Sequence, residues 1–283
     1  MPLCPVSRGV VEMHLTIWEY CVAAVAGGVA GAVNAVAGGG TLVSFSVLLG
    51  IGVPPVTANV TNTVGLVPAY LAGSWGQRSD LRPQLHRARS LAVTALVGGL
   101  AGSVLLVTIP ATAFRAVAPF LILTACILLA SEVPLRRRLR PAIPAHANVG
   151  TTAGDQFHRR SPSSPQWTKP AVVSVLCASI YGGFFGAGLG IMLMAVLAFF
   201  SEESLLNVNA LKQALSFVIN LVAAGFFVIF GHVRWDLIPW MAVAGVIGGL
   251  LGSRLARIIK PEYLRWTVVV AGVIVAVVLW ATL

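Results

Sequence analysis

Charged side chains are scarce in this 283-residue sequence, at 10% of the chain, whereas 57% of the residues are hydrophobic. A soluble globular domain carries about 25% charged residues, so this composition cannot cover a water-exposed surface. Uncharged apolar stretches at 91–109 and 266–283 approach the roughly 20 residues that cross a bilayer. The composition therefore excludes a soluble protein and predicts a polytopic membrane protein in contact with the lipid bilayer.

Cysteine and histidine are also few, and neither forms a metal-binding or redox pattern. The four cysteines are scattered without a CxxC pair, and none of the five histidines has metal-ligand spacing. The sequence contains no HExxH, no GxSxG, no nucleotide-binding P-loop and no paired intramembrane carboxylates. We therefore expect no metal, no cofactor and no catalytic residue, and an enzyme ranks last among the functions considered.

Nucleic-acid binding is not expected either, although the formal net charge is +10. The basic residues lie between hydrophobic segments rather than in one domain or along one face. This distribution is typical of cytoplasmic loops that follow the positive-inside rule. No cleavage site follows a short apolar core near the start, so a removed signal peptide is not expected, and translation could begin at Met1 or at Met13.

The apolar segments form two sets of five around one polar stretch. They run at about 15–36, 40–51, 59–76, 89–108 and 113–131, and again at about 171–188, 190–200, 208–230, 237–253 and 266–282. The stretch between the sets is rich in proline, serine and arginine, which is typical of a flexible linker. The sequence thus predicts a first transmembrane repeat at 15–131, a basic cytoplasmic linker at 132–169 and a second repeat at 170–283.

The two sets share an internal repeat. The hexapeptide GGLAGS starts at residue 98 and GGLLGS at residue 248, 150 residues later. The same shift pairs Gly38 with Gly188, Gly40 with Gly190, Asn59 with Asn209, and Arg115 with Arg265. If the basic loops 77–90 and 254–265 are both cytoplasmic, each half makes an odd number of crossings. We therefore predict duplicated, inverted halves, in which the two hexapeptides are helix-packing motifs.

Polar residues stand where one apolar segment enters the membrane, in NVNALKQALSFVIN (207–220). On a helix, one face carries Asn209, Lys212 or Gln213, Ser216 and Asn220. Burying a lysine in hydrocarbon costs about 2.5–3.5 kcal/mol on insertion scales, and an anionic substrate would offset that cost. The alternative is that Lys212 snorkels to the headgroup interface.

A matching polar cluster occurs in the first half, in ANVTNTVG (58–65). It places Asn59, Asn62 and Thr63 on one helical face, and Asn62 corresponds to Lys212 at the shift of 150 residues. Two related clusters are what a binding site at the interface of two halves requires. Snorkelling alone does not explain the matching asparagines, so the pair favours a binding site.

Glycines interrupt two apolar segments at matching positions, in NAVAGGGTLV (34–43) and FFGAGLGIML (184–193). Because each glycine weakens a helix, and three stand in a row at Gly38 to Gly40, we predict a functional break in each segment rather than close helix packing alone. A half-helix that begins near Thr41 or Ile191 would attract anions through its backbone N–H groups and its dipole. Asn34 and Thr41 could add side-chain donors.

These motifs resemble the TauE/SafE sulfite exporter family, also called toluene-sulfonate uptake permeases (TSUP). The resemblance rests on GAVNAVAGGGTLV, GVPPVTANVTN, YGGFFGAGLG and NVNALKQALSFVINLVA, and it covers nearly the whole chain apart from the linker and the N-terminal dozen residues. It implies a duplicated multi-pass transporter that moves sulfite, sulfonates or related organic anions across the bacterial inner membrane. It also implies a pathway lined by Gly38, Gly39, Gly40, Asn59, Asn62, Gly188, Gly190, Asn209 and Lys212. The chain departs from the family's N-x-T-N-R element, since Thr63 follows Asn62.

The expected function is secondary transport of small anions, with sulfite or sulfonates as the leading class. The alternatives are an anion channel and a non-transporting membrane accessory protein. The expected substrate-binding residues are Asn34, Gly38, Gly39, Gly40, Thr41, Asn59, Asn62, Thr63, Gly188, Gly190, Asn209, Lys212, Gln213 and Ser216. Besides the anion, the expected partner is a coupling ion, either a proton or sodium, and a homodimer is a possible assembly.

Overall fold

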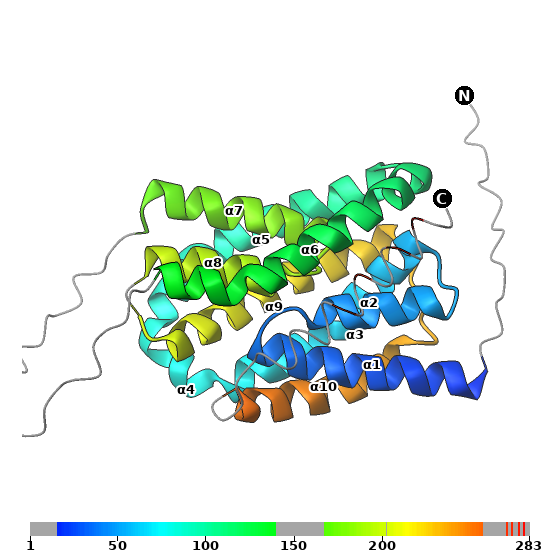
Figure 1. Ribbon diagram of the computed structural model, residues 1–283, viewed down its shortest axis with the longest axis horizontal. Coiled ribbons are helices and arrows are strands. Elements are labelled where there is room, and N and C mark those ends of the chain that lie inside the picture. Colours follow the sequence, from blue (N-terminus) through cyan, green and yellow to red (C-terminus); the bar gives the residue numbers. More distant parts are fainter. Residues whose placement is uncertain are drawn as a thin grey trace, which may run out of the picture.

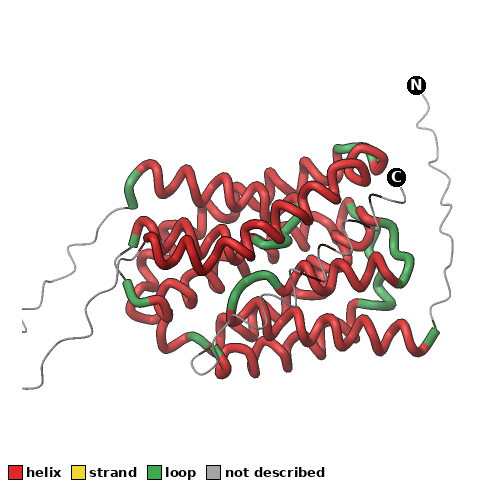
Figure 2. Tube along the Cα trace, viewed as in Figure 1, coloured by secondary structure: helices red, strands yellow, loops and turns green. Residues whose placement is uncertain are grey.

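The computed structural model describes residues 16–139, 167–201 and 203–256, together with residues 270, 273, 277 and 280. Every regular element in these ranges is helical (Figure 2). The elements are α1 (Ile17–Val36), α2 (Gly40–Gly50), α3 (Pro55–Gly76), α4 (Arg78–Leu81), the 3-10 turn η1 (Arg82–Gln84), α5 (Leu85–Thr108), α6 (Ala111–Leu139), α7 (Lys169–Phe184), α8 (Leu189–Phe200), α9 (Leu205–Phe230) and α10 (Ile238–Leu255). The predicted all-α class is confirmed.

Several helices are apolar enough to lie in a membrane. Four of those described are also long enough to cross it, at Ile17–Val36, Arg78–Thr108, Leu206–Phe230 and Ile238–Leu255. By contrast, α2 has 11 residues and α8 has 12. At 1.5 Å per residue such helices are about 17 Å long, so neither crosses a hydrocarbon core of about 30 Å alone. The chain is a polytopic membrane protein in which long helices are mixed with half-length ones.

Two predicted segments fall partly outside the described residues. Helix α6 ends at Leu139, so its last turns run into the stretch 132–169 that the sequence assigns to the linker, and residues 140–166 are not described. Of the last apolar segment, 266–282, only four residues are described, and these are helical. The ring of Trp280 lies 5.4 Å from that of Phe120, which places this residue beside α6.

Local sequence explains where several helices begin. The carboxylate of Glu19 caps α1, because its Oε2 accepts hydrogen bonds from the backbone N of Thr16 at 2.6 Å and from Thr16 Oγ1 at 2.9 Å. At the start of α9, Ser204 Oγ accepts a hydrogen bond from the backbone N of Asn207 at 3.2 Å. Proline occupies the first turn of α3, α7 and α10, where an N–H group has no helical partner.

Both predicted helix breaks are confirmed. Gly38, with φ 98°, separates α1 from α2, and Gly188, with φ 78°, separates α7 from α8. Positive φ favours glycine because a Cβ would crowd the backbone there. Figure 1 shows each pair of helices folding back on itself, with the open ends of α1–α2 and of α7–α8 at opposite ends of the bundle.

Close helix packing builds the rest of the bundle. Across it, helices contact one another in the order α1, α10, α3, α9, α5 and α7. A Cβ on Gly248 would meet the carbonyl oxygen of Gly28, and a Cβ on Gly102 would meet that of Ile180. This confirms that GGLAGS and GGLLGS are packing motifs, since a larger residue would separate α5 from α7 and α10 from α1. The order leaves α3 and α9 at the centre.

Candidate functional site

The polar face of α9 is buried at the centre of the bundle. Lys212 is 1% exposed and Gln213 is fully buried. The other members of the face, Asn209, Ser216 and Asn220, are buried as well. Among the described residues, Lys212 is the single lysine, arginine, aspartate or glutamate with a buried side chain. The predicted polar face therefore points into the protein and not toward lipid.

Lys212 reaches the end of a broken helix rather than a headgroup. Its Nζ donates a hydrogen bond to the carbonyl oxygen of Asn34 at 2.9 Å, in the last turn of α1. That carbonyl has no helical donor, because the backbone N–H of Gly38 goes to Val33 instead. The positive charge also faces the negative end of the α1 dipole. The snorkelling alternative is wrong, since a snorkelling ammonium would be exposed.

The next carbonyl of α1, that of Ala35, is held by two amide side chains. It accepts hydrogen bonds from Asn209 Nδ2 at 3.0 Å and from Gln77 Nε2 at 3.2 Å. Asn209 Nδ2 also donates to Gln77 Oε1 at 2.7 Å. Gln77 was not among the predicted site residues, because in the sequence it belongs to the basic loop 77–90. It follows α3 directly and is buried.

On the other side of the first break, Asn34 caps α2. Its Oδ1 accepts hydrogen bonds from the backbone N–H of Gly40 at 2.8 Å and of Thr41 at 3.4 Å. The donors predicted to attract an anion are thus directed at an amide oxygen, which occupies the place of an anionic ligand. Thr41 Oγ1 lies 3.0 Å from the hydroxyl of Tyr70, which also contacts the side chain of Asn220. Tyr70 was missed because it lies in an apolar run.

The three polar residues of α3 separate in the structure. Asn62 Nδ2 donates to the carbonyl oxygen of Thr41 at 3.1 Å, at the first break. Asn59 Nδ2 donates to the carbonyl oxygen of Phe184 at 2.9 Å, at the end of α7. Thr63 Oγ1 donates to the carbonyl oxygen of Asn59 at 2.9 Å, within its own helix. Helix α3 therefore contacts both breaks.

The two breaks meet through their glycines. A Cβ on Gly38 would lie 2.7 Å from the Cα of Gly190, so the backbones are in direct contact. Gly188 instead faces Ala125 on α6. Of the predicted glycines, Gly38 and Gly190 are therefore brought together, whereas polar side chains gather at the first break. These side chains belong to Asn34, Thr41, Asn62, Tyr70, Gln77, Asn209, Lys212, Gln213, Ser216 and Asn220.

Comparison with known proteins now adds to this geometry. Residues 23–279 match the family described as sulfite exporter TauE/SafE, a range that includes both breaks and the polar faces of α3 and α9. The chain belongs to the TauE/SafE family. No solved structure matches it.

Three bacterial proteins are similar to this one over most of its length. A probable membrane transporter protein, ORF9, from a Sinorhizobium species is 28% identical over 246 residues, covering 84% of this chain and 85% of the relative. A probable membrane transporter protein from Haemophilus influenzae is 24% identical over 251 residues, with 89% of each chain covered. The probable membrane transporter protein YfcA of Escherichia coli K12 is 23% identical over 248 residues, covering 87% of this chain and 84% of the relative. This TauE/SafE chain is thus a membrane transporter by family.

Charged contacts hold the two ends of this TauE/SafE protein. At the end with α4, Arg87 forms an ion pair with Glu203 at 2.7 Å. At the opposite end, Arg234 pairs with Asp236 at 2.7 Å, and Tyr20 on α1 donates to Asp236 at 3.1 Å. The hydrogen bond from Arg234 lowers the pKa of Asp236 below its ordinary value. The Arg87–Glu203 pair joins α5 to the turn before α9, and the Tyr20–Asp236 hydrogen bond joins α1 to the loop before α10. The Arg234–Asp236 pair lies within that loop.

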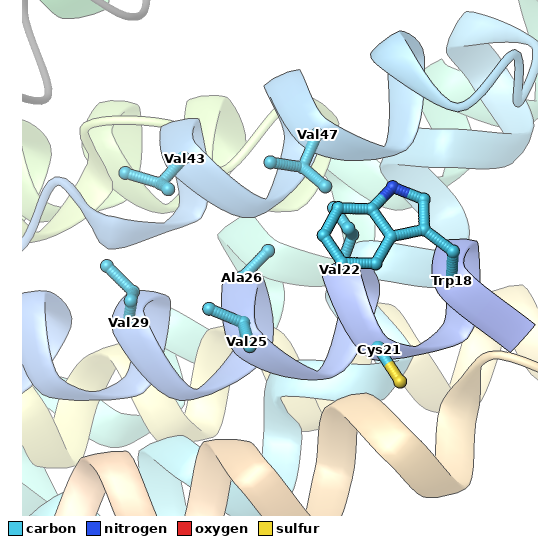
Figure 3. Close-up of a pocket in the computed structure, with 8 residues that line it drawn as sticks. All are labelled: Trp18, Cys21, Val22, Val25, Ala26, Val29, Val43 and Val47. Atoms are coloured by element: carbon cyan, nitrogen blue, oxygen red, sulfur yellow. The ribbon is translucent and has the colours of Figure 1, made fainter.

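An apolar groove of about 290 Å³ lies between α1 and α2 (Figure 3). Its lining residues are Trp18, Cys21, Val22, Val25, Ala26, Val29, Val43 and Val47. Trp18 and Val25 are largely exposed, so the groove opens outward from the bundle. None of the lining residues carries a charge to hold an anion, and the candidate site remains the buried cluster at the first break.

Proposed function

We propose that this protein is a secondary transporter of small anions in the bacterial inner membrane, with sulfite or sulfonates as the leading substrate class. The observation that carries the proposal is Lys212, a buried positive charge on the long apolar helix α9 that contacts the broken end of α1. Ionisable residues within membrane segments mark substrate and ion pathways, because their burial is costly. Broken helices at mid-bundle provide backbone groups for the same purpose.

Matched contacts support a duplicated, inverted arrangement. Asn209 donates to the carbonyl of Ala35 at the end of α1, and Asn59, 150 residues earlier, donates to that of Phe184 at the end of α7. Gln77, just after α3, meets Asn209 near the start of α9, so these two central helices run in opposite directions. Alternating access in such transporters comes from rocking one half against the other around a central site.

The positions of the basic residues support an orientation. The end of the bundle with α4 carries a group of arginines, which are Arg78, Arg82, Arg87, Arg89 and Arg254. The positive-inside rule would place this end in the cytoplasm and the loop 231–237 outside. The bacterial relatives are each named as a probable membrane transporter, which supports a location in a membrane. Coupling to a proton or sodium gradient would drive the cycle.

Transport by the purified full-length chain in proteoliposomes tests the proposal. We expect saturable uptake of sulfite or a short sulfonate, and exchange against the same anion inside the vesicle. Lys212→Met should reduce uptake by about tenfold or more, equivalent to about 1.4 kcal/mol of lost interaction. Lys169→Met is the matched control, because Lys169 is an exposed lysine at the start of α7.

The outcomes separate the alternatives. Normal uptake by Lys212→Met would remove Lys212 from the substrate site. Single-channel conductance without saturation would favour an anion channel instead. No flux of any anion, with a folded protein, would favour an accessory protein.

A further inference from the structure

Several buried amide oxygens at the first break accept no hydrogen bond from the residues that the structure describes. In the described part of the chain, no partner is present for the side-chain oxygens of Asn62, Asn209, Gln213 and Asn220, and the Nε2 of Gln213 also has none there. Each of these residues is at most 4% exposed. The amide nitrogens of Asn62, Asn209 and Asn220 donate hydrogen bonds to backbone carbonyls. This orients each amide so that its oxygen is the group left to accept a hydrogen bond. Buried polar atoms are nearly always paired in native proteins, so these atoms are candidates for binding a ligand.

These oxygens lie beside Lys212 and the end of α1. A Cβ on Gly73 would lie 2.5 Å from Gln213 Nε2 and 3.6 Å from the Cβ of Ala35, so the Gln213 amide sits next to the α1 terminus. Ser216 Oγ, one turn further along α9, also lacks a partner in the described residues. Asn220 reaches Tyr70 and through it Thr41. One positive charge, several amide oxygens, the Nε2 of Gln213 and the hydroxyl of Ser216 therefore border the same region.

The chemistry of this set disfavours a ligand made only of acceptor oxygens. A sulfite dianion or a plain alkyl sulfonate would meet Lys212 and the Nε2 of Gln213 well, but it brings no donor to the oxygens of Asn62, Asn209 and Asn220. A sodium ion would satisfy the oxygens, but it would have to bind close to the ammonium of Lys212, and like charges repel. A ligand with an anionic end and an N–H or O–H group satisfies both the charge and the acceptors.

We propose that the substrate is a small anion that carries its own hydrogen-bond donor, such as a hydroxy- or amino-substituted sulfonate or carboxylate. The inference rests on the proposed anion transport and adds the residues that set its selectivity. The anionic end binds at Lys212, and the donor binds at Gln213 and Ser216. With a rise of 1.5 Å per residue, Ser216 lies about 6 Å along α9 from Lys212, which suits a spacer of two carbons.

A matched pair of ligands tests this. We compare 2-hydroxyethanesulfonate with ethanesulfonate, which has the same charge and carbon chain without the donor, by thermal shift and by competition for uptake. We expect the hydroxylated anion to bind about tenfold tighter or more, because a site built to pair a hydroxyl discriminates strongly against its absence. Gln213→Leu and Ser216→Ala should bring the ratio of the two affinities toward one. Ser179→Ala is the control, since Ser179 is a buried serine whose Oγ is bonded to Val175 on α7.

Each result bears on one claim. Saturable binding of both anions with equal affinity would overturn this inference and leave the proposed transport intact. Sodium-dependent binding without preference for the hydroxyl would also overturn it, by assigning the orphan oxygens to a cation. Failure of every anion to bind or move would instead remove the proposed function on which the inference rests.

Discussion

The ammonium of Lys212 lies 2.9 Å from the carbonyl oxygen of Asn34, a contact between residues 178 positions apart. It joins the head of α9 to the broken end of α1. The side chain of the same Asn34 accepts from Gly40 at the start of α2. Asn34 thus accepts a hydrogen bond from each of two helices, α9 and α2. If the α1–α2 hairpin moves relative to α9, the hydrogen bond from Lys212 must either break or move with the hairpin.

Lys212→Met should separate stability from transport. The variant leaves the Asn34 carbonyl without its donor, which costs about 1–3 kcal/mol. It also removes a buried lysine whose insertion costs about 2.5–3.5 kcal/mol. Because these effects oppose one another, we expect a melting temperature within about 4 °C of the wild type, together with loss of uptake. A large fall in melting temperature with uptake retained would assign Lys212 to the fold alone.

Gln77 and Asn209 should be energetically coupled. They are joined at 2.7 Å and share the carbonyl of Ala35, so either Gln77→Leu or Asn209→Leu leaves the other amide poorly satisfied. A double-mutant cycle on thermal stability should give a coupling of about 0.5–3 kcal/mol. Gln77→Leu combined with Asn59→Leu is the control, because Asn59 bonds Phe184 at the other break. The effects of that pair on stability should be additive. If the effects of Gln77→Leu and Asn209→Leu were additive as well, the two amides would not share the Ala35 carbonyl as described.

The sequence predicted those features of this arrangement that depend on residues close together in the chain, and it did not predict contacts between distant helices. The breaks could be predicted because closely spaced glycines act on their own backbone, and Gly38 and Gly188 do adopt positive φ. The burial of one α9 face followed from helical spacing. The partner of Lys212 could not be predicted, because it is a backbone oxygen in another helix.

The missed residues show the same limit. Gln77 resembles an ordinary loop residue and Tyr70 an ordinary core aromatic, and only the fold brings them to the first break. Thr63 was predicted to bind substrate on the basis of its helical face, yet its hydroxyl bonds within α3. Helical spacing predicts the direction in which a side chain points. The hydrogen-bond partner of its hydroxyl depends on which residues lie nearby in the fold, and the sequence alone does not predict that.

Glycine substitutions should have opposite effects at packed and open positions. A Cβ on Gly248 would meet the carbonyl oxygen of Gly28, so Gly248→Ala forces α10 away from α1. Overpacking of this kind costs about 1–3 kcal/mol. A Cβ on Gly225, in α9, would have no neighbouring atom of the described residues within 4 Å, and Gly225→Ala should stabilise the helix by about 0.5–1 kcal/mol. Melting temperatures of the two variants check this, and a stabilised Gly248→Ala would show that the close helix crossing is wrong.

Acid should release the contact of loop 231–237 with α1. The pKa of Asp236 is lowered from its ordinary value of 3.8, chiefly by the hydrogen bond from Arg234. A carboxyl whose folded pKa is depressed adds stability above its ordinary pKa and loses it as the pH falls through the folded value. We therefore expect Asp236→Asn to lower the melting temperature slightly at neutral pH, and this difference from the wild type to shrink below about pH 4. Because the pair is partly exposed, the contribution is at most about 1 kcal/mol.

In an Arg234→Gln background, Asp236→Asn should change the melting temperature little at any pH, since the main cause of the pKa shift is gone. A difference that persists unchanged to pH 3 would show that Asp236 acts through packing and not through its charge.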